Sequence, residues 1–456
     1  MSAYTLSTAF NLQPHSEMIA FVGGGGKTSL LFGLGATLPG RRILTTTTRI
    51  FAAQMSRAAE LVFATEGTEA IEAKIGAALD RQGVCLVVGA VEGEKAKGVP
   101  PELPDSWLAR PDVDFVLVEA DGSRMRPIKA PAAHEPVIPP QTTLVVPVVG
   151  IDALDGRFSQ VTHRAELAAE LLQNSVIGEQ LSVENVARLI AHPQGGLKGV
   201  PDGARVVPFI NKVETAVQLH AARQIAHQLL NTPRIERVII GATKTAEPVR
   251  EVHQRVTTVI LAAGEGKRMG QQTKQLLPWG STTVLGHTLA NVQQTAVHNH
   301  LVITGHDAEK VRKIALAAGA ETLHNPDFAT GEMISSLQTA VRNLDESVTA
   351  VLVMLADQPM VQPQTMDLLL EAYWQGHGDL IAPVFEGRRG NPVLIGRRYF
   401  AELLALPATD APRTLLRRHA DKLHLVAVPT DDILRDLDSP QQYAQERTKW
   451  DTAHHQ

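Results

Sequence analysis

A loop in the middle of the chain gathers positive charge around residues that have almost no side chain. The stretch 257–277 reads TTVILAAGEGKRMGQQTKQLL, with small residues at 262–264. A ligand can approach the backbone amides of such residues closely, because no bulky side chain stands in the way. Amides combined with clustered cations are typical of a site for several negative charges, such as a triphosphate. The cations are Lys267, Arg268 and Lys274.

Two apolar runs are expected to position this loop and its partners. The run 259–261 has the continuous apolar character of a buried parallel strand. A second apolar run, 350–355, ends just before Asp357. A carboxylate in that place is costly unless solvent or a metal compensates its charge.

The sequence LAAGEGKRMG at 261–270, followed by KQLLP at 274–278, resembles the nucleotidyltransferases that activate a phosphorylated small molecule with an NTP. Within that superfamily it is similar to the molybdenum cofactor cytidylyltransferases. The resemblance implies a Rossmann-like, GT-A-like nucleotidyltransferase domain. It favours CTP as the substrate, because related guanylyltransferases carry a second glycine at the position of Ala263.

The resemblance also assigns roles to single residues. Arg268 and Lys274 would neutralise the triphosphate, and Asp357 would bind the catalytic Mg²⁺. The family's D-x-D-[ST]-P element is present here as DLDSP, and its second aspartate, Asp438, would supply a second carboxylate, because two such oxygen ligands suit Mg²⁺ bound to a triphosphate. Arg388 and Arg389 would contact the phosphate or pterin of the acceptor, with a solvated hairpin as the alternative interpretation. The residues implied to contact the base and sugar are Leu261, Ala262, Ala263 and Gly264.

A second phosphate-binding pattern lies near the N-terminus. A strand-like run, 18–22, leads into four glycines, Lys27 and Thr28, and a helical pattern follows. Loop amides and the helix N-terminus would face an anion while Lys27 adds charge, and the Thr28 hydroxyl would ligate Mg²⁺. The match departs from the strict G-x-x-x-x-G-K-[ST] form, because the first glycine falls on Phe21, so a structural turn is the alternative. The glycines are Gly23, Gly24, Gly25 and Gly26.

Carboxylates follow a third apolar run in the same half. The run 115–118 ends in Glu119 and Asp121. The carboxyl ends of parallel strands border the ligand crevice of an open α/β sheet, so these groups are expected to hold Mg²⁺ opposite the glycine loop. The alternative is a solvated strand end. Lys129 adds positive charge nearby for a second anionic ligand.

Asn211 and Lys212 begin the sequence NKVE, which resembles the guanine-reading N-K-x-D box of GTPases with Glu214 in place of aspartate. The nucleotide of this half is therefore left open between GTP and ATP. The segments VGGGGKTSL, LTTTTRIF and VEADGSRMRPIKAPAAHEPVIP resemble the selenium-dependent molybdenum hydroxylase accessory family. The resemblance implies a P-loop-like domain and a molybdenum hydroxylase apoenzyme as a partner.

Length and composition limit the remaining possibilities. A chain of 456 residues is expected to form two or three domains, here 1–245 and 257–456 with a polar linker at 246–256. Parallel-strand and helix patterns in both halves predict an α/β protein. A net charge of −5 gives no reason to expect nucleic-acid or membrane binding, and the single cysteine excludes an internal disulfide. Without a secretory pattern at the N-terminus, we expect a cytoplasmic protein.

These patterns together favour an enzyme that transfers CMP from CTP to the phosphate of a molybdopterin-type cofactor. Two alternatives stay open on the sequence alone. One is a sugar-phosphate nucleotidyltransferase, which would share the loop and Asp357 but use another acceptor. The other is a non-enzymatic, nucleotide-dependent cofactor chaperone. We expect the sequence from 441 onward to be a fraying helix and tail.

Overall fold

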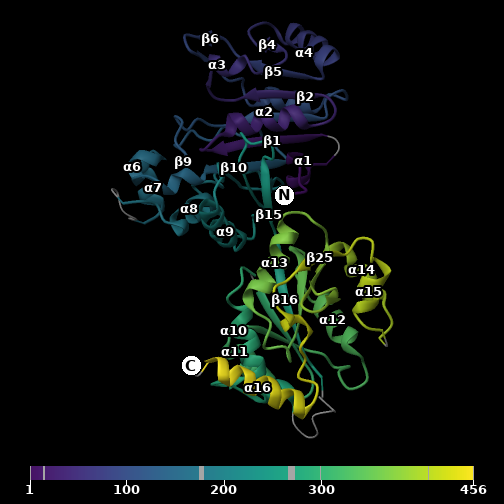
Figure 1. Ribbon diagram of the computed structural model, residues 1–456. Coiled ribbons are helices and arrows are strands. Elements are labelled where there is room, and N and C mark those ends of the chain that lie inside the picture. The colour runs from purple at the N-terminus through teal and green to yellow at the C-terminus, as the bar shows by residue number, and fades with distance from the viewer. Residues whose placement is uncertain are drawn as a thin grey trace. The chain divides into compact units, whose positions relative to one another are not determined.

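The computed structural model describes residues 2–13, 16–173, 179–264, 273–297, 299–408 and 410–454. The chain forms two compact α/β units, Met1–His253 and Gln254–Gln456, each built around its own sheet (Figure 1). The expected fold class is confirmed. Among the described residues, no helix combines the length and the apolar character needed to cross a bilayer.

The sheet of the first unit is parallel in every described pairing except that of its last strand, β15. The strand order is β15-β14-β13-β10-β1-β8-β2-β5-β4, with β12 also paired to β10. The bounds are β1 Glu17–Gly23, β2 Arg42–Thr46, β4 Leu61–Phe63, β5 Val84–Val88, β8 Phe115–Glu119, β10 Leu144–Gly150, β12 Arg205–Val206, β13 Phe209–Asn211, β14 Val238–Gly241 and β15 Val249–His253.

Helices cover both faces of this sheet because side chains of each strand alternate between them. Ile19 and Phe21 of β1 pack in a core with α1 and α2, whereas Met18 packs in the core that includes α4. A further core holds α7, α8 and α9. The helices are α1 Leu6–Ala9, α2 Lys27–Thr37, α4 Thr68–Gln82, α7 Ala165–Leu171, α8 Val183–Ala191 and α9 Ala216–Leu230.

The sheet of the second unit is mixed, with parallel strands on the side that matters for the site. Its order is β20-β19-β16-β21-β24-β22-β23, with β25 paired to β22. β16 runs parallel to both β19 and β21, whereas β24 runs antiparallel to β21. The bounds are β16 Arg255–Ala262, β19 Asn299–Thr304, β20 Glu321–His324, β21 Val348–Leu355, β22 Leu380–Phe385, β23 Arg388–Arg389, β24 Val393–Gly396 and β25 His424–Ala427.

Two helical layers cover this second sheet. One core contains side chains of α10 Val284–Val292, α11 Ala308–Ala317 and α13 Pro363–Trp374. The other contains those of α12 Met333–Arg342, α14 Phe400–Ala405 and α15 Arg413–Arg418. The shorter elements are β3 Ile50–Phe51, α3 Ala52–Met55, β6 Val91–Glu92, β7 Lys95–Ala96, α5 Glu102–Leu108, β9 Ile128–Lys129, η1 Ile151–Leu154, α6 Phe158–Val161, β11 Thr162–His163, η3 Lys274–Leu276, β17 Pro278–Trp279, β18 Thr282–Thr283, η4 Arg397–Tyr399 and η5 Asp431–Leu434.

The stretch 246–256, which we expected to be a linker, contains β15 and the start of β16. Its polar composition has a structural reason. The buried Glu251 accepts hydrogen bonds from Arg223 at 3.0 Å, and its distance to the ring nitrogen of the buried His253 is 2.8 Å. These polar side chains can therefore be buried, because they form hydrogen bonds with one another.

Replacing Glu251 with glutamine is expected to lower the free energy of unfolding by about 2–3 kcal/mol, because Arg223 and His253 lose a buried charged partner. Burial raises the pKa of Glu251, but His253 and Arg223 outweigh it and hold the pKa at about 2. The carboxylate therefore contributes stability above the ordinary pKa of about 4.5, and this contribution disappears as the pH falls towards 2. Urea unfolding at pH 7 and pH 3 measures both effects. A difference between the two proteins that does not shrink at pH 3 would contradict the charge-based reason.

Candidate active site

A cavity of about 540 Å³ opens in the second unit where the parallel strands β16 and β21 end. This is the edge at which open α/β sheets bind ligands. Its walls come from five parts of the sequence, and the lining residues are Leu261, Ala262, Ala263, Gly264, Lys274, Gln275, Phe328, Ala329, Thr330, Gly331, Glu332, Met333, Ser336, Leu355, Ala356, Asp357, Asp436 and Asp438. The structure thus brings together the described nucleotide and metal candidates of this half, which are residues 261–264, Lys274, Asp357 and Asp438. Arg268 lies outside the described residues.

Hydrogen bonds from two neighbouring segments hold the small-residue loop at 262–264 in place. The buried Gln275 donates from its side-chain amide to the Ala262 carbonyl at 2.8 Å, and the His306 amide donates to the Ala263 carbonyl at 3.1 Å. Gly305 fits between this loop and Phe328, since a Cβ there would lie 2.6 Å from the Ala263 oxygen. Sequence reasoning missed Gln275, because nothing in its neighbourhood shows that its amide reaches back to the loop.

Replacing Gln275 with leucine is expected to raise the KM for the nucleotide by roughly tenfold, because the Ala262 carbonyl loses a buried donor worth about 1–1.5 kcal/mol. Gln294→Leu is the matched control, since its amide bonds only to its own exposed helix turn. Steady-state kinetics with varied nucleotide measure the change. An equal KM for both variants would show that the amide does not set the loop.

Lys274 lies between the two carboxylates that the sequence singled out. Its ammonium is 3.0 Å from Asp357 Oδ2 and also bonds to Asp438 Oδ1. Burial acts to lower the pKa of Lys274, but the charges of Asp357 and Asp438 outweigh it and raise the pKa above its ordinary value. The lysine is therefore held as a cation within reach of any anion that enters the cavity.

A third carboxylate, Asp436, belongs to the same wall and was not predicted. Gln358 donates to its Oδ1 at 2.7 Å. Burial raises the pKa of Asp436, and the nearby charges of Asp357 and Asp438 add to the rise despite the hydrogen bond from Gln358. In the sequence DLDSP a single residue separates Asp436 from Asp438, and this spacing is the signal that could have revealed Asp436.

The donor set fits a divalent cation that shares its ligands with a substrate. Asp357 and Asp438 already converge on one positive charge, so their oxygens face a common point. Within the described ranges no group of three or more His, Cys, Asp or Glu side chains could hold a metal. Two carboxylates suit Mg²⁺, which keeps its other positions for phosphate oxygens and water.

The structure places the two arginines predicted for the acceptor outside the lining of this cavity. Arg388 and Arg389 are exposed on β23 and do not belong to the described cavity wall. The segment 328–333 forms the wall instead. Beneath it the fully buried Asn325 donates to the hydroxyls of Ser335 and Ser336, each at 3.0 Å.

The glycine loop of the first unit uses its amides differently from the prediction. The Gly23 amide donates to Asp121, the Gly24 amide to the Val148 carbonyl, and the Gly25 amide to the Arg126 carbonyl. A Cβ on Gly25 would lie 2.0 Å from the Gly150 nitrogen, so close backbone packing requires glycine here.

The first three loop amides thus already have protein acceptors. In the described part of the chain, the amides left for an anion are those of Gly26, Lys27 and Thr28, at the start of α2.

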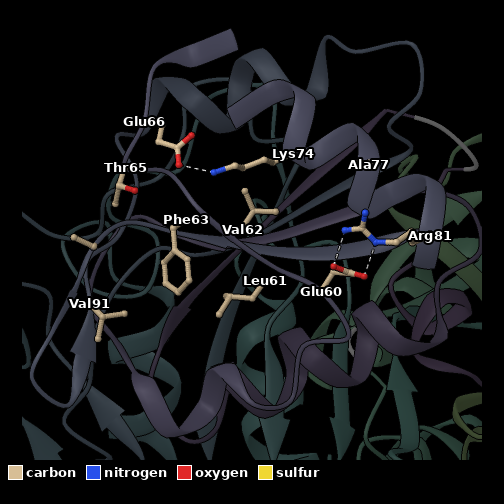
Figure 2. A pocket seen from close by; sticks show the side chains of 11 residues that line it. Glu60, Leu61, Val62, Phe63, Thr65, Glu66, Lys74, Ala77, Arg81 and Val91 are labelled. Atoms are coloured by element: carbon tan, nitrogen blue, oxygen red, sulfur yellow. Dashed lines mark hydrogen bonds and ion pairs between the residues drawn. The ribbon is translucent and has the colours of Figure 1, made fainter. Parts of the chain in front are cut away.

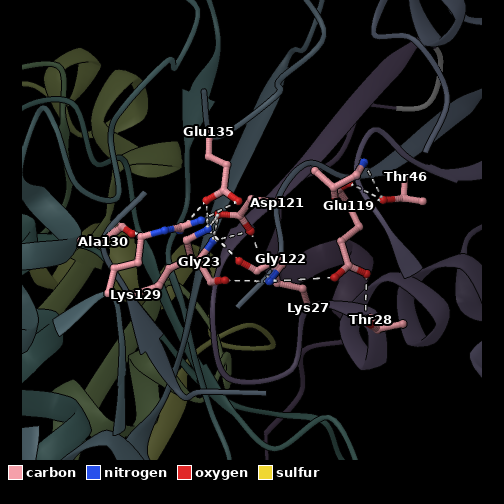
Figure 3. A network of polar contacts seen from close by, with 12 residues as sticks. Gly23, Lys27, Thr28, Thr46, Glu119, Asp121, Gly122, Lys129, Ala130 and Glu135 are labelled. Carbon is pink, nitrogen blue, oxygen red and sulfur yellow. Dashed lines mark hydrogen bonds and ion pairs between the residues drawn. The ribbon is translucent and has the colours of Figure 1, made fainter. Parts of the chain in front are cut away.

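Lys27 lies in a buried polar network at this loop (Figure 3). Its ammonium donates to the Gly23 carbonyl at 2.6 Å and lies 3.2 Å from Asp121. Thr28 donates to Glu119 at 2.8 Å, and burial raises the pKa of Glu119. Thr28 therefore pairs with Glu119, one of the two carboxylates that were expected to hold Mg²⁺.

Asp121 is occupied by other partners. Lys129, which is buried, lies 3.1 Å from Asp121 and 2.6 Å from Glu135 (Figure 3). Glu135 also pairs with Arg164 at 2.7 Å. Lys129 is therefore part of the internal network instead of a second anion site, because the neighbouring carboxylates neutralise it.

Asn211 connects two loops of the first unit. Its side-chain amide donates to the Gly25 carbonyl at 2.8 Å, and its oxygen accepts from the backbone amides of Lys212 and Thr243. The Lys212 ammonium lies 2.6 Å from Asp152. Asn211, which was predicted to bind a nucleotide, thus holds the glycine loop in place through the Gly25 carbonyl.

A larger cavity, of about 670 Å³, lies beside β4 at the edge of the first sheet (Figure 2). Its cations are paired, Lys74 with Glu66 at 2.5 Å and Arg81 with Glu60 at 2.9 Å. The remaining lining is largely apolar, with Leu61, Phe63 and Val91 among it, so this cavity does not share the chemistry of the other site.

Comparison with known proteins separates the two halves. Residues 258–423 match the MobA-like NTP transferase domain, and residues 19–166 match the YqeC protein family. The molybdenum cofactor cytidylyltransferase of Escherichia coli (strain K12) is 26% identical over 190 residues, covering 41% of this chain and 93% of that protein. A crystal structure of a Mycobacterium tuberculosis rv0371c homolog from Mycobacterium sp. strain JC1 has 27% identity, covers 44% of this chain and 98% of that chain, and gives a TM-score of 0.39.

The second unit is a nucleotidyltransferase domain of the MobA-like class, and the protein is therefore an enzyme. The YqeC protein of Escherichia coli (strain K12) is 34% identical over 233 residues, covering 50% of this chain and 88% of that protein. Through its first unit the chain belongs to the YqeC family.

Proposed function

We propose that the second unit transfers CMP from CTP to the terminal phosphate of a molybdopterin-type cofactor and releases pyrophosphate. The observation that carries this proposal is that Asp357 and Asp438 both bond to Lys274 in the cavity at the carboxyl ends of β16 and β21. The similarity to a molybdenum cofactor cytidylyltransferase supports the acceptor, and Ala263 supports CTP as the donor.

In this reaction an oxygen of the acceptor phosphate attacks the α-phosphorus of CTP. The bond from the α-phosphorus to the bridging oxygen breaks, and pyrophosphate leaves with that oxygen. Such chemistry needs positioning and charge neutralisation more than a protein nucleophile. Lys274 would move from its carboxylates to the triphosphate, while Asp357 and Asp438 would hold Mg²⁺. When bound, Mg²⁺ supplies further neutralisation of the phosphate charge.

For the first unit we propose a nucleotide site for GTP or ATP at the start of α2. Gly26, Lys27 and Thr28 supply the free amides and the cation, and the Thr28 and Glu119 oxygens suit Mg²⁺. Such a unit would couple cofactor maturation to delivery towards a molybdenum hydroxylase apoenzyme. This coupling rests on the presence of both units in one chain.

The test follows pyrophosphate release by the full chain with Mg²⁺, each of CTP, GTP, UTP and ATP, and either the molybdopterin-type cofactor or a sugar 1-phosphate. We expect release only when CTP and the pterin cofactor are both present. Release with the sugar phosphate alone would assign a sugar-phosphate nucleotidyltransferase. No release with any pair would leave the second unit as a cofactor-holding module and overturn the proposal.

A further inference from the structure

The C-terminal segment forms the expected helix, α16 Pro440–His454, but the helix packs on the second unit instead of fraying. Most of its residues are polar, so their pattern does not predict that it packs. Two aromatic residues attach it. The Trp450 ring lies 6.1 Å from that of the buried Trp279, and Tyr443 donates to the Pro278 carbonyl at 2.5 Å. Figure 1 shows α16 at the lower end of the second unit, and its Trp450 ring lies 5.8 Å from that of His287 in α10.

The contacts of α16 involve the segment that follows Lys274 and the segment that holds Asp438. Trp279 lies in β17, which begins two residues after η3, the turn that carries Lys274. Asp438 lies two residues before α16, and its amide donates to the side chain of Gln442 in the first turn of the helix at 3.1 Å. The contacts therefore form a closed path from Lys274 through Trp279 and α16 back to Asp438.

Leu437 shows how the path acts on the carboxylates. It is fully buried in the same apolar cluster as Trp279 and Trp450. Asp436 and Asp438, on either side of it, line the cavity. Because Leu437 is fixed in the cluster, its two neighbours are turned towards the cavity. An ion pair between Arg435 and Glu446, at 3.4 Å, also joins the segment 435–438 to the middle of α16.

We propose that α16 is a positioning element that holds Asp438 at the metal and phosphate site, with Trp450 as its anchor. The inference rests on the proposed function of the second unit, because it concerns the placement of one of its metal ligands. Trp450 itself is not among the described residues that line the cavity. Its effect passes through Trp279 and Leu437 to the carboxylate, so Trp450 is a positioning residue.

The test compares Trp450→Ala with Gln445→Ala in the full chain. Gln445 is exposed on the same helix and serves as the matched control. Mn²⁺ with CTP is titrated and followed by electron paramagnetic resonance. We expect Trp450→Ala to weaken Mn²⁺ binding on the order of tenfold, as for other residues that orient metal ligands, and Gln445→Ala to leave it unchanged. Wild-type affinity in a folded Trp450→Ala protein would overturn the proposal.

Two further measurements keep the outcome decisive. If Trp450→Ala fails to fold, Tyr443→Phe removes the hydroxyl that bonds to the Pro278 carbonyl and to Arg447, and should weaken Mn²⁺ binding to a smaller extent. If the wild type binds no Mn²⁺ with CTP, the proposed function fails. Hydrogen exchange then decides the positioning claim alone. Faster exchange at 435–439 in Trp450→Ala than in Gln445→Ala supports the claim, and equal exchange refutes it.

Discussion

Replacing Asp357 with asparagine is expected to lower kcat for pyrophosphate release by about 10³-fold, because a preorganised charge at the reacting phosphates is lost. Asparagine keeps the shape of the side chain but cannot neutralise Mg²⁺ or Lys274. The lysine would keep Asp438 as its partner, so the fold should survive. The KM for the nucleotide should change much less than kcat, because Lys274 remains in the cavity.

The matched control is Asp421→Asn, an exposed aspartate of the same unit. The rates of both variants are measured with saturating CTP and Mg²⁺ and the cofactor acceptor. Raising Mg²⁺ should recover part of the activity of Asp357→Asn if the carboxylate acts through the metal. A rate within a few-fold of the wild type would remove Asp357 from the reaction.

Replacing Lys27 with methionine is expected to weaken GTP or ATP binding by the first unit at least about 100-fold, the effect of removing one member of a buried charge pair. The ammonium is the cation nearest the free amides at the start of α2 and is held there by Gly23 and Asp121. Asp121 would remain paired with Lys129, so the unit should stay folded.

Lys97→Met is the control, because Lys97 is half-exposed and its pair with Glu92 contributes little. Binding of fluorescent GTP and ATP analogues to the full chain gives the affinities, and pyrophosphate release should stay at the wild-type rate in both variants. If neither nucleotide binds the wild type, the first unit has no nucleotide site. If Lys27→Met binds like the wild type, the site lies elsewhere.

Features written in a short stretch of sequence could be predicted. The strand and loop at 259–264 follow from the apolar run 259–261 and the small residues after it. The position of Asp357 follows in the same way from the apolar run 350–355. The meeting of this loop with Asp357 follows from the rule that parallel strands end at one edge. Residues whose role depends on distant contacts could not be predicted. Gln275 works through the Ala262 backbone, and Asn211 works through Gly25.

The first unit shows a second limit of sequence reasoning. A glycine-rich run predicts free amides, but three amides of this run have acceptors supplied by distant parts of the chain. Lys129 is neutralised by Asp121 and Glu135 for the same reason. A sequence records that a residue is charged or small, whereas the partner that uses its charge or its amide is set only by the fold.

The most direct test is a crystal structure of the full chain with Mg²⁺ and CTP, refined well enough to measure metal–oxygen distances. We predict a metal ion about 2.1 Å from an oxygen of Asp357, the expected length for Mg²⁺. The Lys274 ammonium should have left the carboxylates for a phosphate oxygen. A nucleotide bound with Asp357 turned away from the metal, or with Lys274 still held between Asp357 and Asp438, would contradict the account.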